Sequence, residues 1–262
     1  MTSVPSLDEL RAAIDRIDDA MLDLIADRVE ITRAVGMRKR LDNAPMLRPG
    51  REAQLLRRLA AKGALRGTEP GVIVRIWREL FALSFTGLQT RLTLVVGSND
   101  RRIWDLARDH FGAAFPMRRC PAAADALAVL ASGEVDLAVL PWPGETGDGL
   151  WWRDLASSDD GEIGVFVALP FLAEPGAAPV MALGRHVAEP SGDDLTLVAI
   201  HDAHAPDGAA GLAIAWSLDA DDGRWRLAAL EGFIAADDPR LARLGGRVRR
   251  IGAYARPIDP GR

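Results

Sequence analysis

The first forty residues carry apolar positions at the spacing of a helix. From Ser6 to Arg40 there is almost no helix breaker, and apolar residues recur mostly at steps of three and four. They are Leu7, Leu10, Ile14, Ile17, Met21, Leu24, Ile25 and Val35. This pattern predicts one long amphipathic helix. Ser6 followed by Glu9 fits a capping box at its start, and the run from Asp42 to Pro45 ends it.

Two shorter helices follow. Residues 51–61 form the first, with Pro49 suited to its opening turn, and glycines at 63 and 67 mark the next loop. Pro70 opens the second, which continues to about Gln89. The N-terminal part is therefore expected to be entirely helical.

The period changes after Leu92. Residues 92–97 and 135–140 are short apolar runs typical of buried strands, and 101–111 and 122–131 have helical patterns between them. This alternation predicts an α/β unit with a parallel sheet. Further strand candidates are 164–169, 180–183, 195–200, 212–218, 225–233 and 247–253. The pattern divides the chain into a helical domain, 1–90, and an α/β domain, 91–262.

Composition narrows the classes of function. The chain has 262 residues, of which 48% are hydrophobic and 26% charged, as in ordinary globular proteins. A net charge of -5 argues against a nucleic-acid partner. The sequence has no apolar run long enough for a membrane span and no basic-then-apolar leader at its start, so we expect a cytoplasmic protein. Cys120 is the single cysteine, which excludes an intrachain disulfide.

Cations on the first helix suggest an anionic ligand. Arg28 and Lys39 are eleven residues apart, close to three full turns, so they share one face. Arg11 lies roughly 25 Å along the axis from Arg28 and about 100° off that face. Arg11 and Arg28 can hold the same small ligand only if a second copy of the chain supplies one of them.

A dianionic substrate would explain an inward-facing cluster of Arg28, Lys39 and Arg51, because guanidinium groups pair bidentately with carboxylates. Glu52 beside them can accept a hydrogen bond from a substrate hydroxyl. Basic residues at helical spacing also form ordinary solvated faces with i,i+4 pairs. Spacing alone leaves both interpretations open.

Three runs in the first 90 residues keep the order and spacing of known motifs: LRAAIDRIDDAMLDLIADRVEITRAVGMRKR, RPGREAQLLRRL and VIVRIWRELFALS. This part of the chain resembles the AroQ-class chorismate mutases. The resemblance implies an intertwined all-α homodimer with two equivalent active sites that converts chorismate to prephenate. It implies no cofactor and no metal, because the rearrangement is unimolecular and needs neither base nor nucleophile.

The resemblance also implies roles for individual residues. Arg28 and Arg51 would bind substrate carboxylates, and Ser84 would help with one of them. Arg11 would enter the neighbouring subunit's site, in agreement with its distance from Arg28.

Lys39 would contact the ether oxygen and a carboxylate, and Glu52 would hold the ring hydroxyl. Two positions depart from the family pattern. An acidic residue usual three positions before the Arg-Glu pair is Arg48 here, and the usual glutamine four residues after the serine is Leu88. Either a small bend brings Gln89 round as the second donor to the ether oxygen, or the site lacks this donor.

Residues from 92 onward resemble, in patches, the prephenate dehydratase module that follows such mutase domains. The resemblance implies a truncated lobe like those of periplasmic binding proteins, followed by an ACT-like remnant. Where the family carries Thr-Arg-Phe, this chain has Ala178, Pro179 and Val180, none of which can donate a proton to a leaving hydroxyl. We expect no dehydratase activity.

Smaller groups of residues have simpler interpretations. His201, Asp202 and His204 suggest a metal site, but two histidines are a poor ligand set and a loop is favoured. Residues 219–223 read as a hairpin turn. Three tryptophans flank a loop rich in proline and glycine, where they either cover a sheet edge, which we favour, or bind a partner. They are Trp142, Trp151 and Trp152.

The sequence therefore predicts a cytoplasmic chorismate mutase of phenylalanine and tyrosine biosynthesis with a non-catalytic C-terminal domain. The alternative is a decayed mutase domain that serves as a dimerisation scaffold for a ligand- or partner-binding tail. Keeping Arg11, Arg28, Lys39, Arg51 and Glu52 favours the enzyme, because inward-facing charges cost desolvation. The displaced glutamine is the main point against it.

Overall fold

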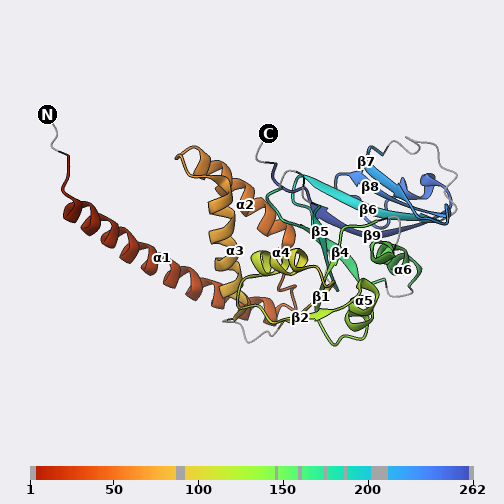
Figure 1. Ribbon diagram of the computed structural model, residues 1–262, viewed down its shortest axis with the longest axis horizontal. Coiled ribbons are helices and arrows are strands. Elements are labelled where there is room, and N and C mark those ends of the chain that lie inside the picture. The colour runs from red at the N-terminus through yellow and green to blue at the C-terminus, as the bar shows by residue number, and fades with distance from the viewer. Residues whose placement is uncertain are drawn as a thin grey trace.

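The computed structural model describes residues 4–86, 92–144, 147–158, 161–173, 176, 178–185, 188–201 and 212–259, and every side chain within them except those of 84–86. Three helices open the chain: α1 (Leu7–Leu41), α2 (Pro49–Ala64) and α3 (Pro70–Thr86). A sheet with helices packed on it follows, and α1 projects away from this body as a long arm (Figure 1). The expected combination of a helical N-terminal part and an α/β C-terminal part is confirmed. The division at 90/91 falls between described residues and stays a prediction.

Helix α1 begins and ends where its sequence predicts. The Ser6 hydroxyl accepts from the Glu9 amide at 3.3 Å, and the Glu9 carboxylate accepts from the Ser6 amide at 2.7 Å, which completes the capping box. At the other end Asp42 is the C-cap and Asn43 has a φ of 50°. Both ends of α1 are thus formed by residues that lie next to the helix in the sequence.

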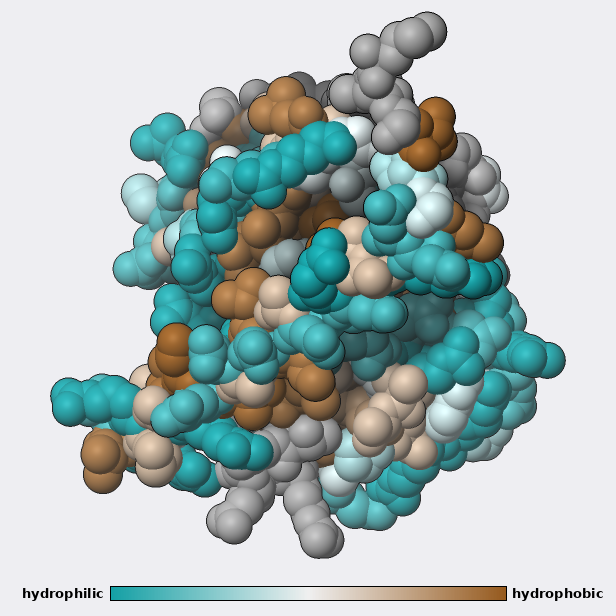
Figure 2. All heavy atoms as spheres, turned by 90° about the vertical axis from the view of Figure 1, so that its left-hand side faces the viewer, coloured by the Kyte–Doolittle hydropathy of each residue, from teal (hydrophilic) through white to brown (hydrophobic). Residues whose placement is uncertain are grey.

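The apolar face of α1 is exposed in the single chain. Six of its apolar side chains are between 46% and 67% exposed: Leu7, Leu10, Ile14, Ile17, Met21 and Leu24. Apolar side chains lie open between hydrophilic ones on the side of the molecule from which α1 projects (Figure 2). A row of exposed apolar residues on one helix is typical of a surface that another helix covers.

Helices α2 and α3 pack against each other and against the sheet. Their shared core contains Ala53, Leu56, Val74 and Phe81, together with Phe171 from the C-terminal part. Pro49 occupies the first turn of α2, where its missing N–H costs nothing. The two parts of the chain are thus joined by a hydrophobic contact.

The described strands form one sheet of nine, in the order β2-β1-β3-β5-β4-β9-β6-β8-β7. Their bounds are β1 (Leu94–Gly97), β2 (Met117–Cys120), β3 (Leu137–Pro141), β4 (Gly164–Leu169), β5 (Val180–Gly184), β6 (Asp194–His201), β7 (Ile214–Asp219), β8 (Trp225–Glu231) and β9 (Arg247–Ala255). The helices and 3-10 turns that follow α3 are α4 (Arg101–Phe111), α5 (Ala123–Ala131), η1 (Gly147–Leu150), α6 (Trp151–Ser157) and η3 (Leu241–Leu244).

The parallel sheet expected from the alternating pattern is only partly correct. Strand β1 is parallel to β2 and to β3, and β4 to β9, whereas the other neighbouring pairs are antiparallel. Helices α4 and α5 supply the crossovers that parallel neighbours need. The later strands are joined without such helices, and β7 and β8 form a hairpin whose turn contains Gly223 at φ 64°, as expected for 219–223.

Alternating residues of β1 show that both faces of the sheet are covered. Val95 packs in the core that contains α5 and α6, whereas Leu94 and Val96 pack in the core that contains α4. The burial of all four strand residues explains why β1 reads as a continuous apolar run.

The expectation that the three tryptophans cover a sheet edge is wrong for two of them. Trp151 and Trp152 on α6 are 1% and 0% exposed and pack inside the core that covers one face of the sheet. Their indole N–H groups donate to the carbonyls of Pro141 and Gly144. They neither cover a sheet edge nor offer a partner surface. Trp142 instead contacts Trp216 of the edge strand β7, with ring centroids 5.2 Å apart.

Candidate functional site

Two cations of α1 point toward the other helices of the N-terminal part. The Arg28 guanidinium donates to the carbonyl of Leu80 at 2.9 Å and lies 5.7 Å from the Phe81 ring centroid. The Lys39 ammonium donates to the carbonyl of Met46 at 2.9 Å. Both side chains are half-buried, and this burial lowers the pKa of each. The predicted shared face is therefore the face that α1 turns to the domain.

Glu52 of α2 meets a residue that the sequence patterns did not single out. Its Oε2 accepts from Nη1 of Arg78 on α3 at 2.8 Å, and the Arg78 side chain is only 6% exposed. Burial raises the pKa of Glu52, while the Arg78 cation opposes that rise. A signal was present in the sequence, because Val74, Arg78 and Phe81 follow helical spacing and form the buried face of α3.

Arg78 also links the helices to the C-terminal part. Its guanidinium lies 5.8 Å from the Phe81 ring centroid and 5.6 Å from that of Phe171. Its Nε is buried and has no hydrogen-bond partner among the described residues. A small cavity lies beside Glu52 and Arg78, and its wall includes His110 of α4. Burial, and then the Arg78 cation, holds the pKa of His110 well below 6.5, so its imidazole is neutral at pH 7.

A second carboxylate, that of Glu189, lies beside the start of α2. Nε of Arg48 lies 2.6 Å from Oε2 of Glu189, a residue of the C-terminal part. The main-chain N–H of Arg51 donates to Oε1 of the same carboxylate at 3.2 Å. The Glu189 carboxylate also interacts electrostatically with Lys39. Burial and the Arg48 cation lower the pKa of Lys39, and the charges of Glu52 and Glu189 oppose this lowering.

The structure separates the other predicted residues. The Arg11 side chain is 67% exposed and pairs with Asp8 at 3.5 Å on the distant end of α1. Arg51 is exposed too, so the expectation that all five charged groups turn inward is wrong for Arg11 and Arg51 in the single chain. The side chain of Ser84 and all of Gln89 lie outside the described residues. The structure thus brings Lys39, Glu52 and Arg28 toward one region of the helical domain and leaves their roles as predictions.

Of the three residues suggested as a metal site, the structure describes His201. His201 lies edge-on to Trp225 with centroids 4.6 Å apart, and Asp202 and His204 lie outside the described residues. Within the described ranges, no group of three or more His, Cys, Asp or Glu side chains is placed to hold a metal ion. No helix in the same ranges is long and apolar enough to cross a membrane.

Comparison with known proteins bears on the N-terminal part first. Residues 10–86 match the family model of chorismate mutase type II. Over 67 residues the chain is 39% identical to a 4-amino-4-deoxychorismate mutase of Streptomyces pristinaespiralis, and over 83 residues it is 35% identical to the T-protein of Enterobacter agglomerans. These matches cover 26% and 32% of this chain, and 52% and 22% of the two relatives.

Among solved structures, the chain is similar to a prephenate dehydratase of Arthrobacter aurescens in complex with L-Phe. The TM-score is 0.47 at 14% identity, over 63% of this chain and 90% of the other. The residues that match the family span most of α1 and all of α2 and α3. Residues 10–86 are a chorismate mutase type II domain.

Proposed function

We propose that the N-terminal domain rearranges chorismate to prephenate within a homodimer. Each site would combine Arg28, Lys39, Arg51 and Glu52 of one protomer with Arg11 of the partner subunit. The observation that carries the proposal is the placement of Arg28 and Lys39. These half-buried cations of one face of α1 donate to the carbonyls of Leu80 and Met46, which leaves their positive charge available to a dianion.

The chemistry needs orientation and electrostatics. The rearrangement is unimolecular, so the site has to hold the compact conformer of the substrate, in which the reacting carbons are close. Negative charge grows on the ether oxygen as its bond breaks, and a preorganised cation there lowers the barrier. Lys39 takes this role in the proposal, and removing such a donor costs on the order of 3 kcal/mol.

Glu52 would accept a hydrogen bond from the ring hydroxyl. Its ion pair with Arg78 offsets its negative charge, so the pair offers a hydrogen-bond acceptor with little net charge. Such an acceptor suits a neutral hydroxyl better than an ammonium group. We therefore propose chorismate, and not its 4-amino analogue, as the substrate, although one relative is a 4-amino-4-deoxychorismate mutase.

Exposed apolar residues of α1 support the dimer. A row of them extends from Leu7 to Leu24, and a second α1 is the partner whose own row matches it. Arg11 is carried on the same segment. Antiparallel pairing of two copies would bring Arg11 of the partner subunit toward Lys39 and Arg28, which no movement within one chain achieves.

The C-terminal domain would not act as a dehydratase. The resemblance to dehydratases places a threonine where this chain has Ala178, whose carbonyl accepts from Arg102 of α4. Its side chain offers no group that can protonate a leaving hydroxyl. Incubation with prephenate at neutral pH should give no phenylpyruvate, and its appearance would refute this part of the proposal.

The decisive assay is the loss of chorismate absorbance with purified protein. Lys39→Ala should lower kcat/KM by about a hundredfold or more. The matched control is Lys62→Ala, since Lys62 is an exposed lysine in the last turn of α2 and should behave as wild type. No turnover by a folded, dimeric wild type would contradict the proposal and leave the decayed scaffold as the function.

A further inference from the structure

One loop of the C-terminal part lies along α2. Residues 188–193 lead into β6, and they contact α2 and its N-cap at four positions that are three residues apart. Successive positions of α2 contact successive residues of the loop. The α2 positions are Arg48, Arg51, Gln54 and Arg57, and their partners in order are Glu189, Glu189, Pro190 and Ser191 with Asp193.

The contact is close enough to require a glycine. A Cβ on Gly50 would lie 2.7 Å from Cγ of Glu189 and 2.8 Å from the carbonyl oxygens of Glu189 and Pro190. Carbon atoms do not approach these distances without displacement, so the loop can lie here only because residue 50 has no side chain. Glycine inside a helix is about 1 kcal/mol less favourable than alanine.

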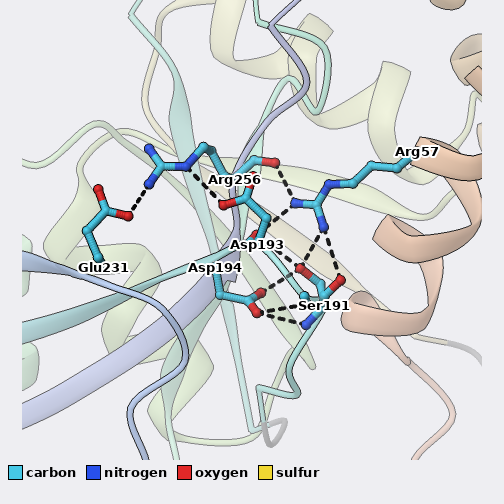
Figure 3. Close-up of polar contacts among 7 residues, drawn as sticks. Arg57, Ser191, Asp193, Asp194, Glu231 and Arg256 are labelled. Carbon is cyan, nitrogen blue, oxygen red and sulfur yellow. Dashed lines mark hydrogen bonds and ion pairs between the residues drawn. The ribbon is translucent and has the colours of Figure 1, made fainter. Parts of the chain in front are cut away.

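Hydrogen bonds within the loop hold its conformation. The Asp194 carboxylate, 4% exposed, accepts from the Ser191 hydroxyl at 2.6 Å and from the amides of Ser191 and Gly192. Arg57 then donates to the Ser191 hydroxyl at 2.9 Å and to the carbonyl of Asp193 at 2.7 Å, while Arg256 bonds the Asp193 carboxylate (Figure 3). The residues that follow Glu189 are therefore held by hydrogen bonds to Arg57, Asp194 and Arg256.

Glu189 supplies what the start of α2 lacks. The N-cap residue is Arg48, which makes no side-chain hydrogen bond to the helix. The Glu189 carboxylate accepts the amide of Arg51 in the first turn, and an anion at this end of a helix is favoured by the helix dipole. It also pairs with Arg48 and so offsets a cation that acts on Lys39.

We infer that Glu189 is a positioning residue of the mutase site, contributed by the C-terminal domain. Its carboxylate holds Arg48 and the first turn of α2, the turn that carries Arg51 and Glu52. The C-terminal domain is then part of the catalytic unit without performing a reaction of its own. This inference rests on the proposed mutase function.

The test is Glu189→Gln in the full-length chain, which keeps the size of the side chain and removes its charge. The expected result is a fall of about tenfold in kcat, from the loss of the negative charge at the start of α2 and of the ion pair with Arg48. The alkaline limb of the rate profile should also move to lower pH. Arg48, Glu52 and Glu189 are the charged groups acting on Lys39, and removing Glu189 leaves Arg48 to lower its pKa unopposed by that carboxylate.

A second variant tests the contact between the loop and α2 by changing α2. Gly50→Ala should push the loop away from α2 and reproduce the loss of kcat, although alanine is the better helix former. Glu134→Gln is the matched control, because Glu134 makes an equally short ion pair, 2.6 Å, with Arg118 of β2. It should leave both kcat and the pH profile unchanged.

The outcomes separate the two proposals. An inactive wild type refutes the mutase function and this inference with it. An active wild type whose Glu189→Gln and Gly50→Ala variants keep its kcat and pH profile refutes the inference alone. A Glu189→Gln variant with a lower KM and undiminished kcat also refutes it, since Glu189 would then be a competitor of the substrate carboxylate.

Discussion

Glu52 on α2 and Arg78 on α3 form an ion pair with 2.8 Å between Oε2 and Nη1, and the arginine is almost completely buried. The pair ties α2, the helix that carries Arg51 and Glu52, to α3, which packs against α4. It also determines the charge that a substrate hydroxyl would meet at Glu52. The same two residues thus bear on both the stability and the chemistry of the helical domain.

Breaking this pair should be costly, whereas removing it entirely should not. Arg78→Met leaves the Glu52 carboxylate without its partner, and we expect the free energy of unfolding to fall by roughly 3 kcal/mol. The double variant Glu52→Met/Arg78→Met should recover most of this loss, because no unpaired charge remains. Arg75→Met, an exposed arginine of the same helix, is the control. Urea unfolding measures all three, and equal losses for the single and double variants would show that the unpaired Glu52 charge is not the cause of the loss.

Shared sites predict that two inactive variants complement each other. Arg11→Ala and Lys39→Ala should each lose most activity. After mixing and subunit exchange, each heterodimer would contain one intact site, with Lys39 from one chain and Arg11 from the other, so about a quarter of wild-type activity should return. A mixture no more active than its parts, with exchange verified by mass, would show that Arg11 does not serve the neighbouring site.

His110 should make the protein less stable in mild acid. Its folded-state pKa is lowered well below 6.5 by burial and by Arg78, so below about pH 6.5 the unfolded chain takes up a proton that the folded chain does not. Stability is therefore complete above that pH and falls by up to about 1.4 kcal/mol per pH unit as the pH decreases. His110→Gln should flatten the decline in unfolding free energy between pH 6.5 and 5. Parallel curves for the two proteins would contradict the burial of a neutral imidazole.

Arg57 should be a main anchor of α2 on the sheet. Its guanidinium donates to the Ser191 hydroxyl and to the carbonyls of Ser191, Asp193 and Arg256. Arg57→Ala should lower the free energy of unfolding by about 2 kcal/mol. Arg57→Lys should recover little of it, because an ammonium group cannot reproduce the planar fork.

The neighbouring Arg58 is exposed and provides the control. Arg58→Ala should change stability by less than about 0.5 kcal/mol. An Arg57→Ala variant as stable as Arg58→Ala would mean that the contacts in Figure 3 contribute nothing to docking.

Helices were predictable where the spacing of apolar residues and the capping residues lie within the helix itself. The capping box at Ser6 and the span 101–111 agree with the structure because a helix depends on neighbours within a few residues. Strand β2 was missed, since its residues Met117–Cys120 are polar at the centre and half-buried at both ends. Helix α6 was missed because seven residues are too few to show a period.

The sequence by itself determined that the chain begins with three helices, that about its first 90 residues carry motifs resembling those of mutases, and that Arg28 and Lys39 share a face. Tertiary structure alone decided which charges meet. Glu52 and Arg78 are 26 residues apart, and Arg48 and Glu189 are 141 apart. Periodicity relates residues of one element only, whereas these pairs form where separate elements pack, and that packing depends on the whole core.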